Sequence, residues 1–266
     1  MCGIFGVINY GGRLTMSELT EFKKLLEELL RASESRGKDA SGICVVSDNR
    51  ALIYKNNTSG GSLPNESGYK KLMDSIRYDN NINYAFGHTR LPTKGSEDIN
   101  TNNHPIVVDK IIGVHNGHIS NDDALFDMYP ALVRKGEVDS EIIFQLLNRH
   151  MKDSPVIEEA VKATYKEIIG CAHVAFIHTD YKQYLTLFTG GDIHIAHNNF
   201  RKIMMFASTS LILKSVMRKS SLFNGYSDTI EIKYGSACRI NTSNGKVHLF
   251  NLEHRIPGHT SQYAGY

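Results

Sequence analysis

The chain has 266 residues, of which 41% are hydrophobic and 22% are charged, as is ordinary for a globular protein with a sizeable core. Lys and Arg total 30 against 28 Asp and Glu, and no basic block occurs, so charge gives no case for binding nucleic acid or a membrane surface. The sequence has neither the pattern of a signal peptide nor an apolar stretch of membrane-spanning length.

In chain order, hydrophobic spacing and turn signals predict a series of strands and helices. The first half is expected to contain strand 2–9, a helix that starts after Thr15 with Glu18 completing a capping box, strands 42–48 and 51–55, an exposed loop 56–68, strand 84–90, a long polar connection 91–104 and strand 111–116. The second half is expected to contain helices 121–127, 139–151 and 155–168, strands 172–178, 184–189, 193–197 and 203–207, helix 210–218, and strands 229–232, 236–241 and 246–250.

These elements come in runs and do not alternate strictly, which favours layered α+β packing over a doubly wound parallel sheet. We find no internal repeat, low-complexity tract or interdomain linker. One domain over residues 1–266 is therefore expected. Residues 253–266 contain Pro257, Gly258 and Gly265 and little apolar mass, which is typical of an exposed carboxy-terminal tail.

Four cysteines, Cys2, Cys44, Cys171 and Cys238, lie far apart and form no CxxC pair. Cys44 and Cys171 fall in apolar, strand-like runs, so we expect them to be reduced and buried. The pattern predicts a cytoplasmic protein without a disulfide framework or structural zinc.

Cys2 follows the initiator Met, which is normally removed before a small residue. Removal would place a thiol and a free α-amine on one carbon. Because an α-amine has a pKa near ~8, the same residue could then supply both a nucleophile and its base. The alternative is that Cys2 is a small buried residue that opens a strand.

Four further segments contain residues that are suited to chemistry: Arg36–Gly42 (RGKDASG), Gly87–Gly95 (GHTRLPTKG), Val114–Asn121 (VHNGHISN) and Asp139-Ser140-Glu141. Each also has a structural interpretation. Asn116-Gly117 is a common turn pair, Asp139 is a reasonable helix N-cap, and the others could be solvated loops. Their combination in this order after Cys2 favours a functional interpretation.

With these segments the chain resembles the class II glutamine amidotransferases, which are N-terminal nucleophile hydrolases. The matching strings also include NNHPI, VDSEII and, more weakly, FAST at 206–209. The motifs are nearest to the glutaminase domain of the glucosamine-6-phosphate synthases. The resemblance implies a four-layer αββα sandwich that hydrolyses the amide of glutamine to glutamate and ammonia through a Cys2 thioester, without a cofactor or metal.

The resemblance also implies roles for particular residues. The nucleophile would be Cys2, and the Asn116 side chain with the Gly117 N–H would stabilise the oxyanion. The substrate's α-carboxylate would be bound by Arg90 and its α-ammonium by Asp139. Thr93 would lie in a loop that closes over glutamine, while Arg36 and Asp39 would have supporting roles.

Two residues depart from the pattern of the sugar-phosphate aminotransferase branch. Leu91 replaces a Trp that helps to gate ammonia passage there, and Lys94 replaces a His. Gating is therefore in question, whereas glutamine cleavage is not. No segment resembles an acceptor domain, so we expect a separate synthase or acceptor protein as partner.

Two other functions stay open at this stage. One is a stand-alone hydrolase of a γ-glutamyl peptide or amide, and the other is a catalytically silent glutamine-binding subunit. The twelve histidines do not favour a metal site, because the His194/His197 pair lies on a predicted strand that would point the two side chains to opposite faces.

Overall fold

A computed structural model of the chain describes residues 2–47, 50–76, 82–189, 191, 193–223 and 228–252. The helices within them are α1 (Met16–Ser33), α2 (Ser67–Ser75), α3 (Asp122–Met128), α4 (Ser140–Asp153), α5 (Ile157–Glu167) and α6 (Ser210–Met217). The strands are β1 (Gly3–Asn9), β2 (Ala40–Ser47), β3 (Ala51–Asn56), β4 (Ile82–Arg90), β5 (Ile106–Val108), β6 (Ile111–Ile119), β7 (Gly170–His178), β8 (Tyr184–Thr189), β9 (Ile193–Asn198), β10 (Ile203–Ala207), β11 (Asp228–Ile232), β12 (Ser236–Asn241) and β13 (Val247–Asn251).

Within these residues the strands form two antiparallel sheets. One has the order β11-β9-β10-β1-β4-β2-β3, and the other has the order β13-β12-β8-β7-β6-β5. The first strand, β1, lies in the middle of its sheet between β10 and β4, and it faces β6 and β7 of the other sheet. This position places Cys2, which directly precedes β1, at the end of a central strand.

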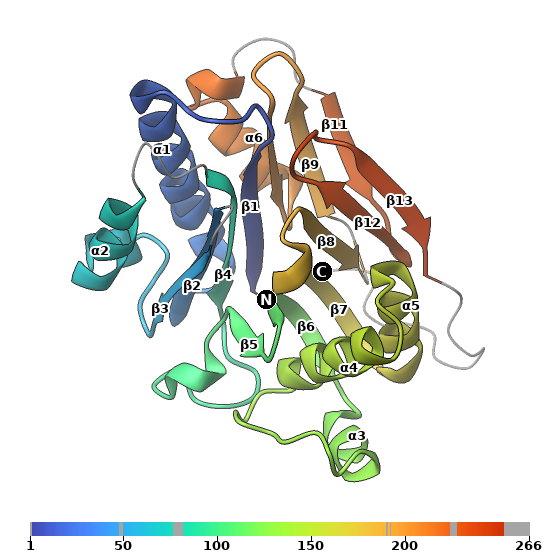
Figure 1. Cartoon of the computed structure of the whole chain (residues 1–266). Coiled ribbons are helices and arrows are strands. Elements are labelled where there is room, and N and C mark those ends of the chain that lie inside the picture. Colours follow the sequence, from blue (N-terminus) through green and yellow to red (C-terminus); the bar gives the residue numbers. More distant parts are fainter. Residues whose placement is uncertain are drawn as a thin grey trace.

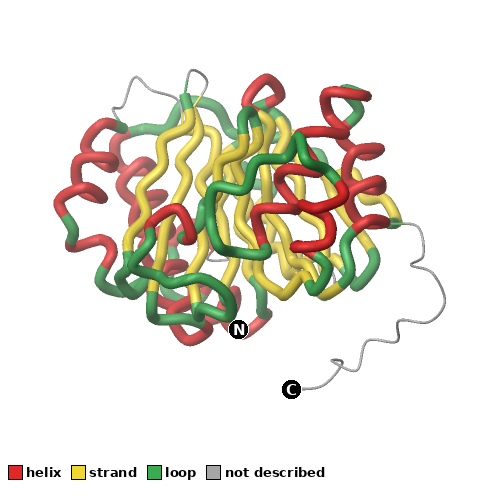
Figure 2. Tube along the Cα trace, turned by 90° about the horizontal axis from the view of Figure 1, so that it is seen from below, coloured by secondary structure: helices red, strands yellow, loops and turns green. Residues whose placement is uncertain are grey.

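The sheets lie between two layers of helices (Figures 1 and 2). Helices α1, α2 and α6 pack on the outer face of the sheet that contains β1, and α3, α4 and α5 pack on the outer face of the other. A third apolar core fills the space between the sheets. The predicted four-layer αββα sandwich is confirmed.

Side chains along β1 point alternately to its two faces, so this strand contributes to two apolar cores. Phe5 and Val7 point to the helical side, whereas Ile4 and Ile8 point between the sheets, and all four side chains are buried. Because both faces are covered, β1 has no polar side chain from Gly3 to Ile8. Burial on both sides fixes its register and hence the position of Cys2.

Several expectations are confirmed and others are wrong in detail. The capping box at α1 is present, with Glu18 N donating to Thr15 Oγ1 at 3.3 Å and Thr15 N to Glu18 Oε2 at 2.9 Å. The loop at 56–68 is not uniformly exposed, because Leu63 is fully buried beneath the helical layer. The predicted tail at 253–266 lies outside the described residues. No helix in the described ranges has the length and apolar character needed to cross a membrane.

Candidate active site

The start of β1 and the end of β6 meet at Cys2. The backbone nitrogen of Cys2 donates a hydrogen bond to Asn116 Oδ1 at 3.1 Å, although the two residues are 114 positions apart in the sequence. This contact joins the two sheets, because β1 belongs to one and β6 to the other. With Met1 in place this nitrogen is a peptide nitrogen, and removal of Met1 makes it the α-amine.

The Cys2 thiol is partly buried beneath the segment that leaves β4. Its Sγ accepts a hydrogen bond from the Leu91 N–H at 3.3 Å. Burial raises the pKa of the thiol above its ordinary value. The Leu91 hydrogen bond and the positive charges of Arg90 and Arg36 act to lower that pKa, and so they favour the reactive thiolate.

Arg36 holds the main chain of the nucleophile. Its Nε donates to the Cys2 carbonyl oxygen at 2.8 Å. The adjacent Gly37 packs against the Arg90 carbonyl group, and a Cβ at Gly37 would lie 2.4 Å from the Arg90 carbonyl carbon. Asp39 then donates its backbone N–H to Arg90 O at 3.1 Å. The segment therefore fixes the backbone on both sides of the thiol.

Gly117 lies where only glycine fits. Its φ is +147°, and an added Cβ would lie 1.9 Å from the carbonyl oxygen of Cys171 on the neighbouring strand β7. Glycine at this position therefore lets β6 and β7 pack closely beside Asn116. The interpretation of Asn116-Gly117 as a simple turn pair is wrong, because both residues lie within β6.

Arg90, the last residue of β4, has a buried side chain that is ordered by three acceptors. Its Nη1 donates to Asn103 Oδ1 at 2.9 Å, and its Nη2 donates to the carbonyl oxygens of Lys94 at 2.9 Å and Gly95 at 2.8 Å. A guanidinium has five N–H groups, so two remain without a partner among the described residues. They can bind a carboxylate.

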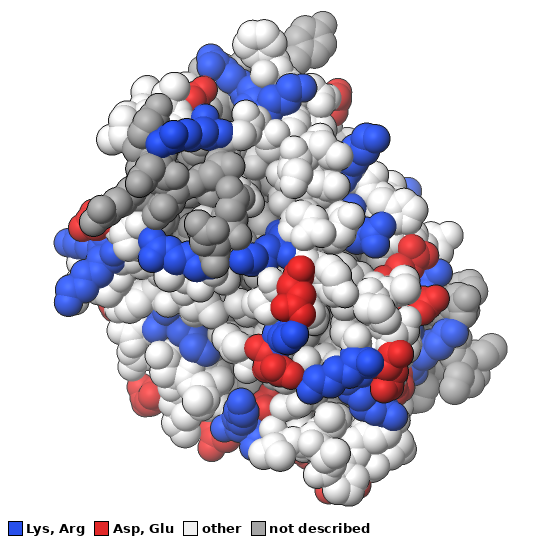
Figure 3. Space-filling model, viewed as in Figure 1, with Lys and Arg blue, Asp and Glu red and all other residues white. Residues whose placement is uncertain are grey.

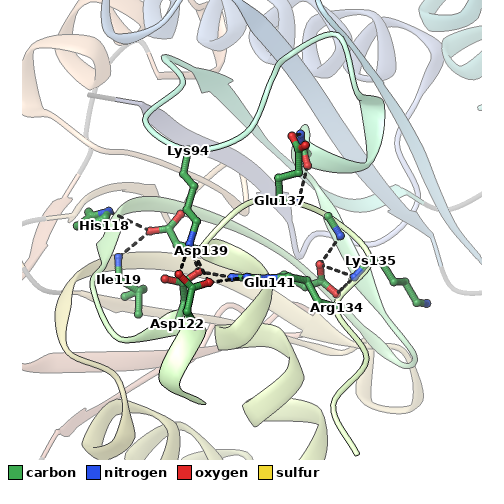
Figure 4. A network of polar contacts seen from close by, with 12 residues as sticks. Lys94, His118, Ile119, Asp122, Arg134, Lys135, Glu137, Asp139 and Glu141 are labelled. Atoms are coloured by element: carbon green, nitrogen blue, oxygen red, sulfur yellow. Dashed lines mark hydrogen bonds and ion pairs between the residues drawn. The ribbon is translucent and has the colours of Figure 1, made fainter. Parts of the chain in front are cut away.

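Asp139 is buried just before α4, near the end of β6. Its Oδ2 accepts from the Ile119 N–H at 2.6 Å and lies 3.4 Å from His118 Nδ1, as Figure 4 shows. Asp139 occupies the N-cap position but makes no capping hydrogen bond, so the interpretation of its side chain as a helix cap is wrong. Burial lowers the pKa of Arg90, and the negative charge of Asp139 is one of several that act to raise that pKa.

Thr93 lies in the segment after β4, and its side chain is exposed. Its predicted contact with substrate stays a prediction. Cys171, which was expected to be buried, is only half-buried, because it lies near the start of β7 beside the site. Cys44 is buried as expected.

Sequence reasoning missed the role of His115. Its Nδ1 lies 2.8 Å from Ser140 Oγ, so it links β6 to the start of α4. Two more histidines, His88 and His104, are buried nearby with their ring centroids 4.3 Å apart. Burial lowers the pKa of His88 to about 3 and lowers the pKa of His104 well below its ordinary value. The motif GHTR contained His88 but gave no partner for it.

On the face of the molecule that Figure 3 shows, acidic and basic side chains are intermingled and form no patch of a single charge. No group of three or more His, Cys, Asp or Glu side chains in the described part of the chain is arranged to hold a metal ion. The site is thus built from a thiol, an amide, a guanidinium and a carboxylate.

The chain is similar in sequence and fold to known proteins, although no family model matches it. Glutamine–fructose-6-phosphate aminotransferase (isomerizing) of Bartonella henselae is 31% identical over 182 residues, which cover 66% of this chain and 26% of that enzyme. The corresponding enzyme of Geobacillus kaustophilus is 30% identical over 182 residues, 66% of this chain and 27% of that enzyme. This chain spans about a quarter of the length of these curated relatives.

Among solved structures, glutamine phosphoribosylpyrophosphate amidotransferase from B. subtilis matches with a TM-score of 0.72 and 15% identity, over 96% of this chain and 50% of that chain. The two structures therefore share a fold.

Proposed function

Because the chain belongs to the class II glutamine amidotransferases, we propose that it hydrolyses the side-chain amide of L-glutamine to glutamate and ammonia. The observation that carries the proposal is the hydrogen bond between the Cys2 nitrogen and Asn116 Oδ1. It brings the nucleophile, its own nitrogen and an amide side chain to one point between the sheets.

In the first half of the reaction, the Cys2 thiolate attacks the amide carbon of glutamine. The α-amine, freed by removal of Met1, takes the thiol proton. The tetrahedral intermediate then collapses with cleavage of the carbon–nitrogen bond. The α-amine passes its proton to the leaving nitrogen, which departs as ammonia and leaves a thioester on Cys2.

In the second half, the α-amine takes a proton from water as the water attacks the thioester. Collapse releases glutamate, and the proton returns to the thiolate of Cys2. In both halves negative charge develops on the substrate oxygen. The Asn116 side-chain N–H and the Gly117 N–H are the donors proposed to stabilise it. Because Asn116 Oδ1 accepts the hydrogen bond from the Cys2 nitrogen, the Nδ2 end of the Asn116 side chain is the end that can donate to the substrate oxygen.

Free glutamine carries a zwitterionic end that the site must also bind. A remaining N–H group of Arg90 is proposed to bind its carboxylate, and Asp139 is proposed to bind its ammonium. The Arg90 and Asp139 side chains are both buried, so the charged ends of a bound substrate would complete their ionic interactions. Because the site would bind both a free α-carboxylate and a free α-ammonium, it favours free glutamine over a glutamine residue inside a protein.

We further propose that the ammonia is used by an acceptor enzyme outside these 266 residues. The proposal is supported by the relatives, which are about four times longer than the segment that this chain matches. Native mass spectrometry of the protein purified from its own cells tests this point. Recovery of the chain in a stable complex with a synthase is expected, and recovery of the chain alone under all conditions would contradict it.

The hydrolysis itself is tested by measuring glutamate and ammonia release from glutamine by protein whose mass shows that Met1 is absent. Equal amounts of both products are expected, and none from Cys2→Ala. Release of an amine from γ-glutamyl amides, without activity on glutamine, would reject the proposal.

A further inference from the structure

Lys94 binds two acidic side chains at the start of α3. Its Nζ lies 2.6 Å from Asp122 Oδ2 and 3.1 Å from Asp123 Oδ1 (Figure 4). The Asp122 side chain is only 5% exposed, whereas that of Asp123 is 71% exposed. The bond to Asp122 is therefore the better shielded of the two, and it is screened less by salt.

Arg134 holds the same pair of carboxylates from the opposite side. Its Nη1 lies 2.5 Å from Asp123 Oδ1, and its Nη2 contacts Asp122 Oδ2. The guanidinium also stacks over the Phe126 ring at 4.4 Å from the ring centroid. Both carboxylates are thus also held by Arg134, independently of Lys94, and together they form an anchor for the lysine.

The backbone of Lys94 has a separate task. Its carbonyl oxygen, together with that of Gly95, accepts both hydrogen bonds from Arg90 Nη2. One residue therefore connects the anchor on α3 to the guanidinium proposed to bind the substrate carboxylate. Here Lys94 stands where the sugar-phosphate branch usually has His.

We propose that Lys94 is a positioning residue that sets how the site recognises the α-carboxylate of its substrate. Its side chain ties the segment 91–95 to Asp122, and its carbonyl group orients Arg90. The inference rests on the proposed function, because the carboxylate in question is that of glutamine.

The segment 91–95 needs such a tie because it follows the end of β4 and makes no strand pairing of its own. Leu91 is 45% exposed, and Thr93 is exposed as well. A second anchor acts beyond Gly95, where Ser96 N donates to Glu137 Oε2 at 3.2 Å and Asn102 Nδ2 donates to Ser96 O at 2.9 Å. Loss of the Lys94 tie should therefore loosen Arg90 without releasing it completely.

The test compares two substrates that share the reacting amide. Glutamine carries the α-carboxylate, and 4-aminobutanamide lacks it but keeps the ammonium. We expect Lys94→Met to lower kcat/KM for glutamine about ten-fold, mostly through KM, which is the scale of a weakened charge-assisted hydrogen bond. The kcat/KM for 4-aminobutanamide should not change. The ratio of the two kcat/KM values, which measures the preference for glutamine, should therefore fall about ten-fold.

Two variants complete the design. Lys94→Arg keeps a cation that can reach Asp122 and should retain most of the preference. The matched control is Lys110→Met, because Lys110 Nζ lies 2.6 Å from Asp180 Oδ2 in an exposed ion pair at the other end of β6. This control should leave both substrates unaffected.

An equal change for both substrates in Lys94→Met would overturn the inference, since it would indicate an effect on the thiol through Leu91 or on folding. No change for either substrate would overturn it too. If wild-type protein without Met1 does not hydrolyse glutamine, the proposed function fails. The inference is then tested separately, by calorimetric measurement of glutamine binding to Cys2→Ala protein with and without Lys94→Met. A ten-fold weaker binding of glutamine in the Lys94→Met background would support the role of Lys94, and equal affinity or no binding would reject it.

Discussion

The two halves of the candidate site are held in place by different parts of the chain. In the nucleophile half, Asn116 and Gly117 lie in the ladder between β6 and β7, and Cys2 directly precedes β1, whose Gly3 pairs with Thr89. In the head-group half, the Arg90 side chain is held by the Asn103 side chain and by the loop carbonyls of Lys94 and Gly95, and the Asp139 side chain accepts from the Ile119 N–H at the end of β6.

The difference indicates where each half tolerates change. A ladder-held residue is fixed by backbone geometry, and at Gly117 this geometry admits only glycine. A residue held by side-chain bonds can be held by other chemistry, as the replacement of His by Lys94 illustrates. Substitutions in the nucleophile half should therefore act on the chemical step, and substitutions in the head-group half should act on recognition.

The largest effect is expected from Asn116→Ala. It removes the proposed oxyanion donor and the acceptor of the Cys2 nitrogen, so kcat for glutamine should fall about 100- to 1,000-fold while KM changes little. Steady-state ammonia release measures both constants. A fall smaller than ten-fold would show that Asn116 has no part in stabilising the transition state.

A smaller effect is expected from Asp139→Asn, which keeps an oxygen for the Ile119 N–H but removes the charge. KM for glutamine should rise about ten-fold with kcat nearly unchanged, as expected for a lost ion pair in a buried site. Glutaramate, which lacks the α-amine, should be hydrolysed equally by both proteins. An equal loss for glutamine and glutaramate would argue that Asp139 acts only on the fold.

The smallest effect concerns stability and the buried histidines near the nucleophile half. Burial lowers the pKa of His88 to about 3, so the unfolded chain takes up a proton near pH 6.5 that the folded chain does not. This contribution to stability is therefore present above pH 6.5 and is lost progressively as the pH drops below it, by about 1 kcal/mol from His88 at pH 6.

Thermal or denaturant unfolding at pH 7.5 and pH 6.0 measures this loss. The variant His88→Gln should lose about 1 kcal/mol less than wild-type protein over the same interval. His104→Gln should behave similarly, since burial also lowers the pKa of His104. Identical losses in wild-type and variant proteins would mean that His88 does not resist protonation.

Most of the fold was predictable because its signals are local. The helical spacing of α1 and the apolar runs of β1 and β6 gave their places to within a few residues. The missed helix α2 follows a Gly- and Ser-rich stretch, although its buried Tyr69, Leu72 and Met73 do have helical spacing. The missed strand β5 has three residues, too few for a pattern to emerge.

The site was only partly predictable. Motifs identified Cys2, Arg90, Asn116 and Asp139, and the structure brings them to one region. The contacts that hold the site together were not identified. Hydrophobic periodicity indicates which face of an element is buried, but it does not indicate which side chains meet across the fold. The pair of Lys94 and Asp122, 28 positions apart, is one example. The bond between Asp139 and the Ile119 N–H was missed for the same reason.

The contact between the Cys2 nitrogen and Asn116 has a practical consequence for handling the protein. Any residue left ahead of Cys2, whether Met1 or a purification tag, turns the proposed base into an amide that has no basic lone pair at neutral pH. Such a protein would fold and still be inert. Removal of one amino acid by an aminopeptidase is therefore the maturation step that would turn a folded precursor into a working enzyme.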